Sequence, residues 1–218
     1  MKSFIKNNSL SIVFIVLFLL SMIGQVYFGM QEYNKEIVEE GARAVTWLPY
    51  LTSGHFIETT FENWESEFLQ MALFVILTIF LIQKGSSESK DPNKKEDVDR
   101  EPSPRRKGAP WAVKAGGWIL KLYKYSLTIA LLLLFAISFI FHLYGSLKDE
   151  NHHLLLQHKA PETLAHFITD SKFWFESFQN WQSEFLSIFA MIVLSIYLRQ
   201  IGSPQSKPVD APHDETGE

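Results

Sequence analysis

The sequence predicts an all-α membrane protein with four transmembrane helices, arranged as two tandem helical-hairpin repeats of parallel orientation. Three observations lead to this class: a long internal repeat, four apolar segments of membrane-crossing length, and an unequal distribution of Lys and Arg between the connecting segments. The average composition hides this pattern, because 47% apolar residues is ordinary for a globular protein. The apolar residues are instead gathered into separate runs.

The repeat is centred on a nine-residue motif. Phe61–Leu69 reads Phe-Glu-Asn-Trp-Glu-Ser-Glu-Phe-Leu, and Phe178–Leu186 reads Phe-Gln-Asn-Trp-Gln-Ser-Glu-Phe-Leu. The copies are 117 residues apart, and matches at this spacing extend over roughly residues 4–86 and 121–203. This period is longer than the about 20–50 residues of solenoid repeats. We therefore expect a duplicated two-helix hairpin, with one repeat at 4–86 and the other at 121–203.

Each repeat contains two predicted membrane spans. The expected spans lie at about 9–29 and 61–83 in the first repeat and at about 124–145 and 178–200 in the second. About 20 residues at 1.5 Å each cross a hydrocarbon core of roughly 30 Å. Trp64 and Trp181 then fall in the first turns of the second and fourth spans, where indole rings anchor helices at the membrane interface.

The first span has a second interpretation, as a secretory signal peptide, because Lys2 and Lys6 precede it. Two features oppose this interpretation. No small-residue cleavage site follows Ser21, and the copy of the segment at 125–144 lies deep in the chain. We expect the first span to be retained.

The basic residues predict the orientation. Fifteen of the 20 Lys and Arg residues lie on the side of the two termini and the central connection, and five lie on the side of the two remaining loops. Cytoplasmic loops carry the excess of positive charge. We therefore expect a multi-pass protein of the bacterial cytoplasmic membrane with both termini cytoplasmic, the lipid bilayer as its main partner, and a second copy of the chain as a further candidate partner.

The remaining segments have distinct compositions. Residues 87–117 are rich in Ser, Pro and charge and predict a disordered cytoplasmic linker, and residues 204–218 predict a disordered tail. By contrast, residues 46–51 and 161–168 in the two outer loops are apolar enough to form short surface helices. Pro161 suits a first helical position.

Polar residues at membrane depth are the candidate functional residues. Helical spacing places Asn63 and Glu67 on one face of the second span, and the copy repeats this face. Together with groups from the first and third spans they predict a polar cluster in the outer leaflet: Gln25, Asn63, Glu67, His142, Asn180 and Glu184. Glu62 and Glu65 become Gln in the copy, so we expect their carboxylates to matter less than those of Glu67 and Glu184.

This cluster has two interpretations. In the structural one, Asn63 and Asn180 cap helix ends while Glu67 and Glu184 link helices by hydrogen bonds. In the functional one, the buried carboxylates form a proton or cation site. The second outer loop adds four histidines, which are either a metal site or a solvent-exposed group, and exposure is favoured: His152, His153, His158 and His166.

Several function classes receive no support from the sequence. The net charge of -4 indicates no nucleic-acid partner, and the absence of Cys excludes disulfides and thiolate metal sites. No hydrolase, zinc-protease or nucleotide-binding signature is present, so we predict no catalytic residues, no metal and no cofactor.

The segment Tyr50–Met71, followed by the run Gly-Ser-Ser-Glu-Ser-Lys-Asp-Pro from Gly85, resembles a family of uncharacterised bacterial integral membrane proteins, a domain of unknown function. The resemblance covers about residues 4–202 and implies a bacterial cytoplasmic membrane location but no activity. The leading hypothesis is therefore a non-enzymatic structural or interaction role in the cell envelope. The alternative is a small ion- or proton-coupled transporter or channel that uses Glu67 and Glu184, and a membrane enzyme is a weaker third.

Overall fold

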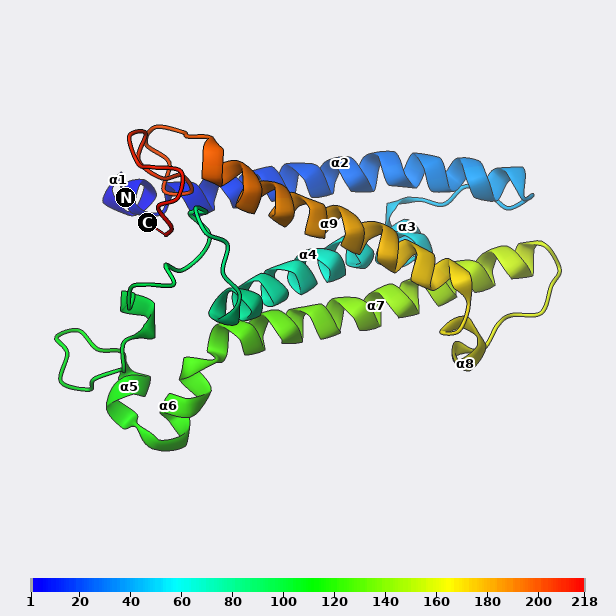
Figure 1. Cartoon of the computed structure of the whole chain (residues 1–218). Helices are drawn as coiled ribbons and strands as arrows, with labels where there is room; N and C mark the ends of the chain where they lie inside the picture. Colours follow the sequence, from blue (N-terminus) through cyan, green and yellow to red (C-terminus); the bar gives the residue numbers. More distant parts are fainter. Residues whose placement is uncertain (1, 218) are drawn as a thin grey trace. The chain divides into compact units, whose positions relative to one another are not determined.

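The computed structural model describes residues 2–217, and these residues contain helices but no β-strand. Four helices are long (Figure 1): α2 (Ser9–Glu39), α4 (Gly54–Phe80), α7 (Ser126–Leu156) and α9 (Ser171–Tyr197). The others are short: α1 (Lys2–Asn7), α3 (Trp47–Leu51), η1 (Asp97–Asp99), α5 (Trp111–Ala115), α6 (Gly117–Lys124) and α8 (Leu164–Phe167).

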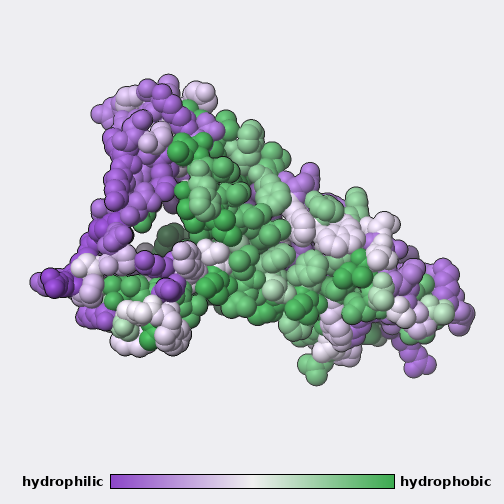
Figure 2. Space-filling model, turned by 60° about the horizontal axis from the view of Figure 1, so that its bottom comes forward, coloured by the Kyte–Doolittle hydropathy of each residue, from purple (hydrophilic) through white to green (hydrophobic). Residues whose placement is uncertain are grey.

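Two of the long helices, α2 and α7, are long and apolar enough to cross a membrane. None of the apolar stretch of α2 and 17% of that of α7 is buried by the rest of the chain. On the face shown in Figure 2, hydrophobic residues gather over the long helices and hydrophilic residues over the connecting segments. A core helix of a soluble protein would bury such a surface instead.

Helices α4 and α9 begin earlier than the sequence predicts. They start at Gly54 and Ser171, so the repeated motif lies inside each helix and not in its first turn. The start is set by capping side chains. The Oγ of Ser53 accepts from the amide of Phe56 at 3.1 Å, and Oδ1 of Asp170 accepts from the amide of Lys172 at 2.7 Å.

The helix boundaries follow the spacing of the sequence repeat. α7 covers the residues of α2 shifted by 117, and α9 covers those of α4 shifted by the same number. The short helices α3 and α8 also begin 117 residues apart. Secondary structure therefore recurs with the period of the sequence.

By internal contacts the chain divides into two compact units. Unit 1 contains residues 2–61 and 140–174, and unit 2 contains residues 62–139 and 175–217. Each unit thus draws on both predicted repeats. The core of unit 1 is Tyr33, Ile37 and Tyr50, with Val26, Met30, Ala42, Val45, Phe56 and Leu156 packed around it.

The connecting segments contain short helices and hydrogen-bonded turns. α3 confirms the expected helix at 46–51, but the helix in the other loop begins at Leu164 with Thr163 as its cap, so Pro161 as first helical residue is wrong. In unit 2 the C-terminal tail contacts the turn that follows α4, where the amide of Gly85 donates to Oγ1 of Thr216 at 2.8 Å. Lys207 donates to three tail carbonyls: Pro212, His213 and Glu215.

Candidate functional site

Helices α4 and α7 cross at near backbone contact in unit 1. A Cβ on Gly54 would lie 2.6 Å from Cα of Asp149, and a Cβ on Gly145 would lie 2.9 Å from Cα of Glu58. Real Cβ atoms essentially never come this close, so both positions require glycine. Small residues at a crossing let helices approach within a membrane protein. We call these four residues the α4–α7 crossing.

The crossing buries polar groups. Glu58 and Asp149 are 7% and 6% exposed, and Ser146 is fully buried. The hydroxyl of Ser146 donates to Oε1 of Glu58 at 3.3 Å. Nearby, the ammonium of Lys148 donates a hydrogen bond to the carbonyl of Thr52. Buried carboxylates need such donors, because an ionised group away from water is costly when unsatisfied.

Two asparagines each hold a loop of unit 1 through a pair of hydrogen bonds to its backbone. The amide of Val45 donates to Oδ1 of Asn34 at 2.6 Å, and Nδ2 of Asn34 donates to the carbonyl of Val45 at 2.9 Å. Asn151 makes the same pair of bonds with Glu162, at 2.6 and 3.1 Å. Both members of this second pair stand 117 residues after those of the first. We call the two pairs the Asn clamps.

Tyrosines and histidines form a further group in unit 1, the Tyr–His cluster: Tyr33, Tyr50, His55, His152 and His153. The hydroxyl of Tyr33 hydrogen-bonds Nδ1 of His152 at 3.1 Å, and that of Tyr50 contacts Nδ1 of His55 at 3.4 Å. Burial raises the pKa of Tyr50 to about 12, and the nearby charge of Asp149 adds to this shift. Its phenol therefore stays protonated at neutral pH.

A hydrogen bond joins Glu40, the residue after α2, to α7. Nδ1 of His153 lies 2.6 Å from Oε2 of Glu40, and Nε2 lies 3.6 Å from Oδ2 of Asp149. Burial opposes the charge of Glu40, but hydrogen bonds from His153 and Gln157 outweigh it and hold the pKa of this carboxyl below its ordinary value. Glu40 is therefore ionised at neutral pH.

In unit 2, α4 and α9 are linked through Glu65 and Gln70. The indole Nε1 of Trp181 donates to Oε1 of the fully buried Glu65 at 2.9 Å. Nε2 of Gln70 donates to the carbonyl of Glu184 and to Oγ of Ser187, each at 2.7 Å. Gln70 and Ser187 stand 117 residues apart, the spacing of the sequence motif, so this bond joins positions that the predicted repeat would make equivalent.

The residues of the predicted polar cluster are divided between the units. In unit 1, Nε2 of Gln25 donates to Oγ1 of Thr60 at 3.1 Å, and the buried ring of His142 packs 4.8 Å from that of Phe173. The other four, Asn63, Glu67, Asn180 and Glu184, belong to unit 2.

Within unit 2 the cluster differs from the prediction in two ways. Asn63 and Asn180 lie inside helices, so their predicted role as helix caps is wrong, and Nδ2 of Asn180 donates to the carbonyl of Glu176 in its own helix. Glu67 is exposed while Glu65 is fully buried, so the predicted ranking of these carboxylates is reversed for burial. Glu184 is half-buried and interacts electrostatically with Glu67.

Other expectations need similar correction. Trp181 is hydrogen-bonded to a buried carboxylate, which a simple interfacial anchor would not be, and Trp64 is half-buried. His158 and His166 are exposed as predicted, but His152 and His153 are half-buried in the Tyr–His cluster. Sequence reasoning also missed the α4–α7 crossing, although Gly145 and Ser146 inside a long apolar helix are a usable signal for close helix packing.

The fold and these contacts define a class: a helical protein with two candidate membrane-crossing helices, a close crossing between α4 and α7, and hydrogen-bonded polar groups between helices. The chain belongs to the family described as Domain of unknown function (DUF6766), whose model matches residues 1–218. Comparison with curated proteins and with solved structures finds no match.

Proposed function

We propose that the chain is a four-span integral membrane protein of the bacterial cytoplasmic membrane, made of two hairpins of the same orientation with both termini cytoplasmic. The exposed apolar surfaces of α2 and α7 support it. Helices α4 and α9 have 27 residues each, about 40 Å at 1.5 Å per residue, which exceeds a hydrocarbon core of roughly 30 Å. The recurrence of helix boundaries at one spacing supports a duplicated hairpin.

Single-cysteine labelling tests this topology, because the chain has no Cys of its own. Arg43→Cys and Lys159→Cys should react with a membrane-impermeant maleimide in intact cells. Lys94→Cys should react only after lysis. The reverse pattern would refute the orientation, and extraction of the protein without detergent would refute the membrane assignment.

The role we propose is structural or interaction-based and non-enzymatic. The observation that carries it is the bracing of both loops of unit 1 by equivalent Asn clamps beside the α4–α7 crossing. Loops fixed at their base by paired backbone hydrogen bonds suit a rigid platform more than a moving lid. This platform carries apolar residues outward on α3, where Trp47 and Leu48 are 47% and 78% exposed above the buried Tyr50. They suit contact with the membrane interface or with a partner.

Complementation of a deletion strain tests this role. A strain lacking the protein should show an envelope defect, such as detergent sensitivity, that the wild-type chain restores. The double variant Glu67→Gln/Glu184→Gln should restore it as well, whereas Asn34→Ala/Asn151→Ala should not. Restoration by the clamp variant at normal expression would refute the platform.

The alternative is an ion- or proton-coupled transporter or channel. The burial of Glu65 and the electrostatic interaction between Glu67 and Glu184 in unit 2 favour it, since ionisable groups inside membranes are functional candidates. Flux of a panel of ions into proteoliposomes tests it. Flux that is lost in Glu67→Gln/Glu184→Gln would establish this alternative, and flux that survives the double change would exclude these two carboxylates.

A further inference from the structure

Residues 102–125, which we call the α5–α6 segment, lead directly into α7. Two consecutive glycines, Gly116 and Gly117, have φ of +67° and +56° and turn the chain between α5 and α6. α6 ends at Lys124 and α7 begins at Ser126, so one residue separates α6 from a helix long enough to cross a membrane. Figure 1 shows the chain turning through α5 and α6 into α7. The position of α6 is therefore tied to the start of α7.

α6 presents an apolar face that the rest of the chain leaves largely uncovered. Helical spacing puts Trp118, Ile119, Leu122 and Tyr123 on this face. Trp118 is 73% exposed, and Leu122 and Tyr123 are exposed as well. On α5, Trp111 is 72% exposed. Exposed apolar patches mark interaction sites, and Trp and Tyr are enriched where a helix lies at a membrane interface.

The α5–α6 segment is also strongly basic. Its six basic residues are all exposed: Arg105, Arg106, Lys107, Lys114, Lys121 and Lys124. The sequence contains no Asp or Glu between Glu101 and Asp149. On α6, Lys121 and Lys124 stand at i and i+3, on the side of the helix away from the apolar face. A helix with an apolar aromatic side and a lysine side is typical of segments that lie on membranes containing anionic lipid.

The positive charges of this segment are available to a partner. Within residues 2–217, none of the six basic side chains forms an ion pair. Glu101 lines the same hollow as Lys124, but it is the last acidic residue before the segment. Its single charge leaves the segment with a clear positive excess.

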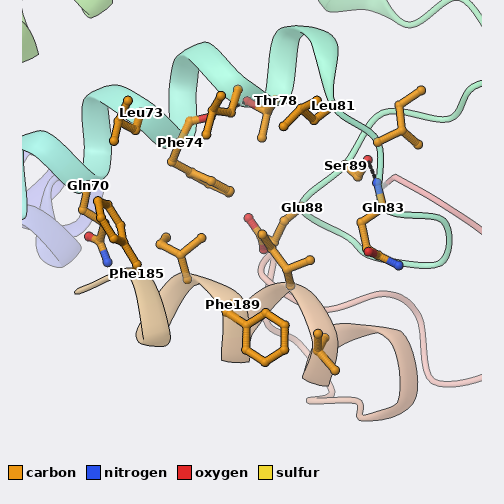
Figure 3. A pocket seen from close by; sticks show the side chains of 15 residues that line it. Gln70, Leu73, Phe74, Thr78, Leu81, Gln83, Glu88, Ser89, Phe185 and Phe189 are labelled. Carbon is orange, nitrogen blue, oxygen red and sulfur yellow. Dashed lines mark hydrogen bonds between the residues drawn. The ribbon is translucent and has the colours of Figure 1, made fainter. Parts of the chain in front are cut away.

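The preceding part of the linker has the opposite character. It begins at one end of the apolar groove between α4 and α9, where Oγ of Ser89 accepts from the amide of Gln83 at 2.9 Å (Figure 3). Residues 86–101 contain six acidic and four basic residues. Three of the four basic residues are in ion pairs: Lys90 with Asp99, Lys94 with Asp91, and Arg100 with Asp97. The fourth, Lys95, is followed directly by Glu96 and Asp97. The positive excess therefore begins only at Arg105.

We propose that the α5–α6 segment binds the anionic phospholipid surface of the membrane that α7 crosses, with the apolar face of α6 in the interface and the basic side chains at the lipid phosphates. The inference rests on the proposed topology, which puts the start of α7 at the cytoplasmic face. There the bilayer offers both an apolar boundary and negative charge. A nucleic acid would match the lysines and stack on Trp118, but it would leave Leu122 in water.

A depth measurement tests the proposal, because the chain has no Cys of its own. The full-length Leu122→Cys protein is labelled with an environment-sensitive dye and reconstituted in phosphatidylcholine vesicles with and without phosphatidylglycerol. With the anionic lipid, the dye emission should shift to the blue and spin-labelled lipid should quench it. Without the anionic lipid, or at high salt, both effects should be several-fold smaller, because salt screens surface charge.

Charge variants in the Leu122→Cys background set the magnitude. Each basic residue near an anionic surface changes the binding equilibrium about fivefold, so Lys121→Gln/Lys124→Gln should lower the ratio of inserted to free α6 by about 25-fold. Lys94→Gln/Lys95→Gln removes the same charge from the preceding part of the linker and should leave the ratio unchanged. Thermal unfolding should show that both variants are folded. If the first is not, Arg105→Gln/Arg106→Gln, which lies outside the helices, replaces it.

Two labelled positions separate failure of this inference from failure of the proposed function. Val98→Cys, at a position that is 79% exposed in the preceding part of the linker, should not be quenched with either lipid. Leu133→Cys, on the apolar stretch of α7, should be quenched with both. Quenching at Leu133→Cys but not at Leu122→Cys would refute the lipid surface alone. Quenching at neither would refute the membrane assignment first.

Three further outcomes would overturn the inference. The first is equal insertion of α6 with and without phosphatidylglycerol, and the second is an unchanged ratio in Lys121→Gln/Lys124→Gln. The third is a single-stranded oligonucleotide that binds the reconstituted protein and withdraws the dye at Leu122→Cys from the lipid. That result would assign the basic surface to nucleic acid instead.

Discussion

The hairpin α2–α3–α4 and the hairpin α7–α8–α9 have matching helix boundaries but differ in the side chains at their helix contacts. Their helices have the same boundaries shifted by 117 residues, and each has an Asn clamp at the same place. Yet the two glycines of the α4–α7 crossing correspond to Ser171 and Phe28 in the other copies. The residues that set local backbone geometry thus recur, while those that set helix packing differ.

This difference confines the glycine-based close contact to one of the two corresponding helix pairs. Gly54 and Gly145 allow α4 and α7 to meet at backbone distance in unit 1. The corresponding pair on α9 and α2 carries side chains, and Phe28 is 69% exposed. Helices with matching boundaries therefore differ in one of the contacts between them.

The largest effect is expected at the crossing itself. Gly145→Leu should destabilise the protein by at least the upper end of the about 1–3 kcal/mol typical of overpacking, because the new side chain meets the backbone of Glu58. Phe28→Leu, at the equivalent position, should have little effect. Thermal unfolding in detergent measures both. Equal stability of the two variants would remove the asymmetry between the hairpins.

The Asn clamps should have the next largest effect. Asn34→Ala and Asn151→Ala each remove two hydrogen bonds to the loop backbone and should each cost about 1–3 kcal/mol. Similar losses of unfolding free energy would show that the two Asn clamps contribute equally to stability. A loss at one clamp alone would show that the hairpins have diverged in their loops too.

A smaller effect is expected where α2 and α7 end. Gly41 has a φ of +90°, and the equivalent His158, at +57°, is the one non-glycine residue with positive φ in the described part of the chain. His158→Gly should relieve strain and stabilise by up to about 1 kcal/mol, whereas Gly41→His should destabilise by about 1–2 kcal/mol. Unfolding curves of the two variants should therefore shift in opposite directions.

The smallest effect is a pH dependence confined to one hairpin. The pKa of Glu40 lies below its ordinary value of 4.5, and its counterpart in the second hairpin is Gln157. Stabilisation from this carboxylate is complete above that ordinary value and is lost as the pH falls through the lower folded value. Glu40→Gln should lose stability at neutral pH and flatten the acid decline. Glu39→Gln, an exposed neighbour, should change neither.

The sequence predicted the helices far better than their contacts. The apolar runs located all four long helices, although capping by Ser53 and Asp170 moved the starts of α4 and α9 upstream of the motif. The candidate polar residues fared less well. Helical spacing could not decide which side of the Asn63–Glu67 face is buried. The importance of Glu65 was underestimated because its copy, Gln182, is uncharged.

Local patterns along the chain thus settle the helical class, the period of 117 residues and the apolar character of α2 and α7, because each depends on neighbours within a few turns. The tertiary structure alone decides which polar groups meet. Ser146 reaches Glu58 across 88 residues, and Trp181 reaches Glu65 across 116. Burial of such a group depends on a partner on another helix, and no spacing within one helix encodes that partner.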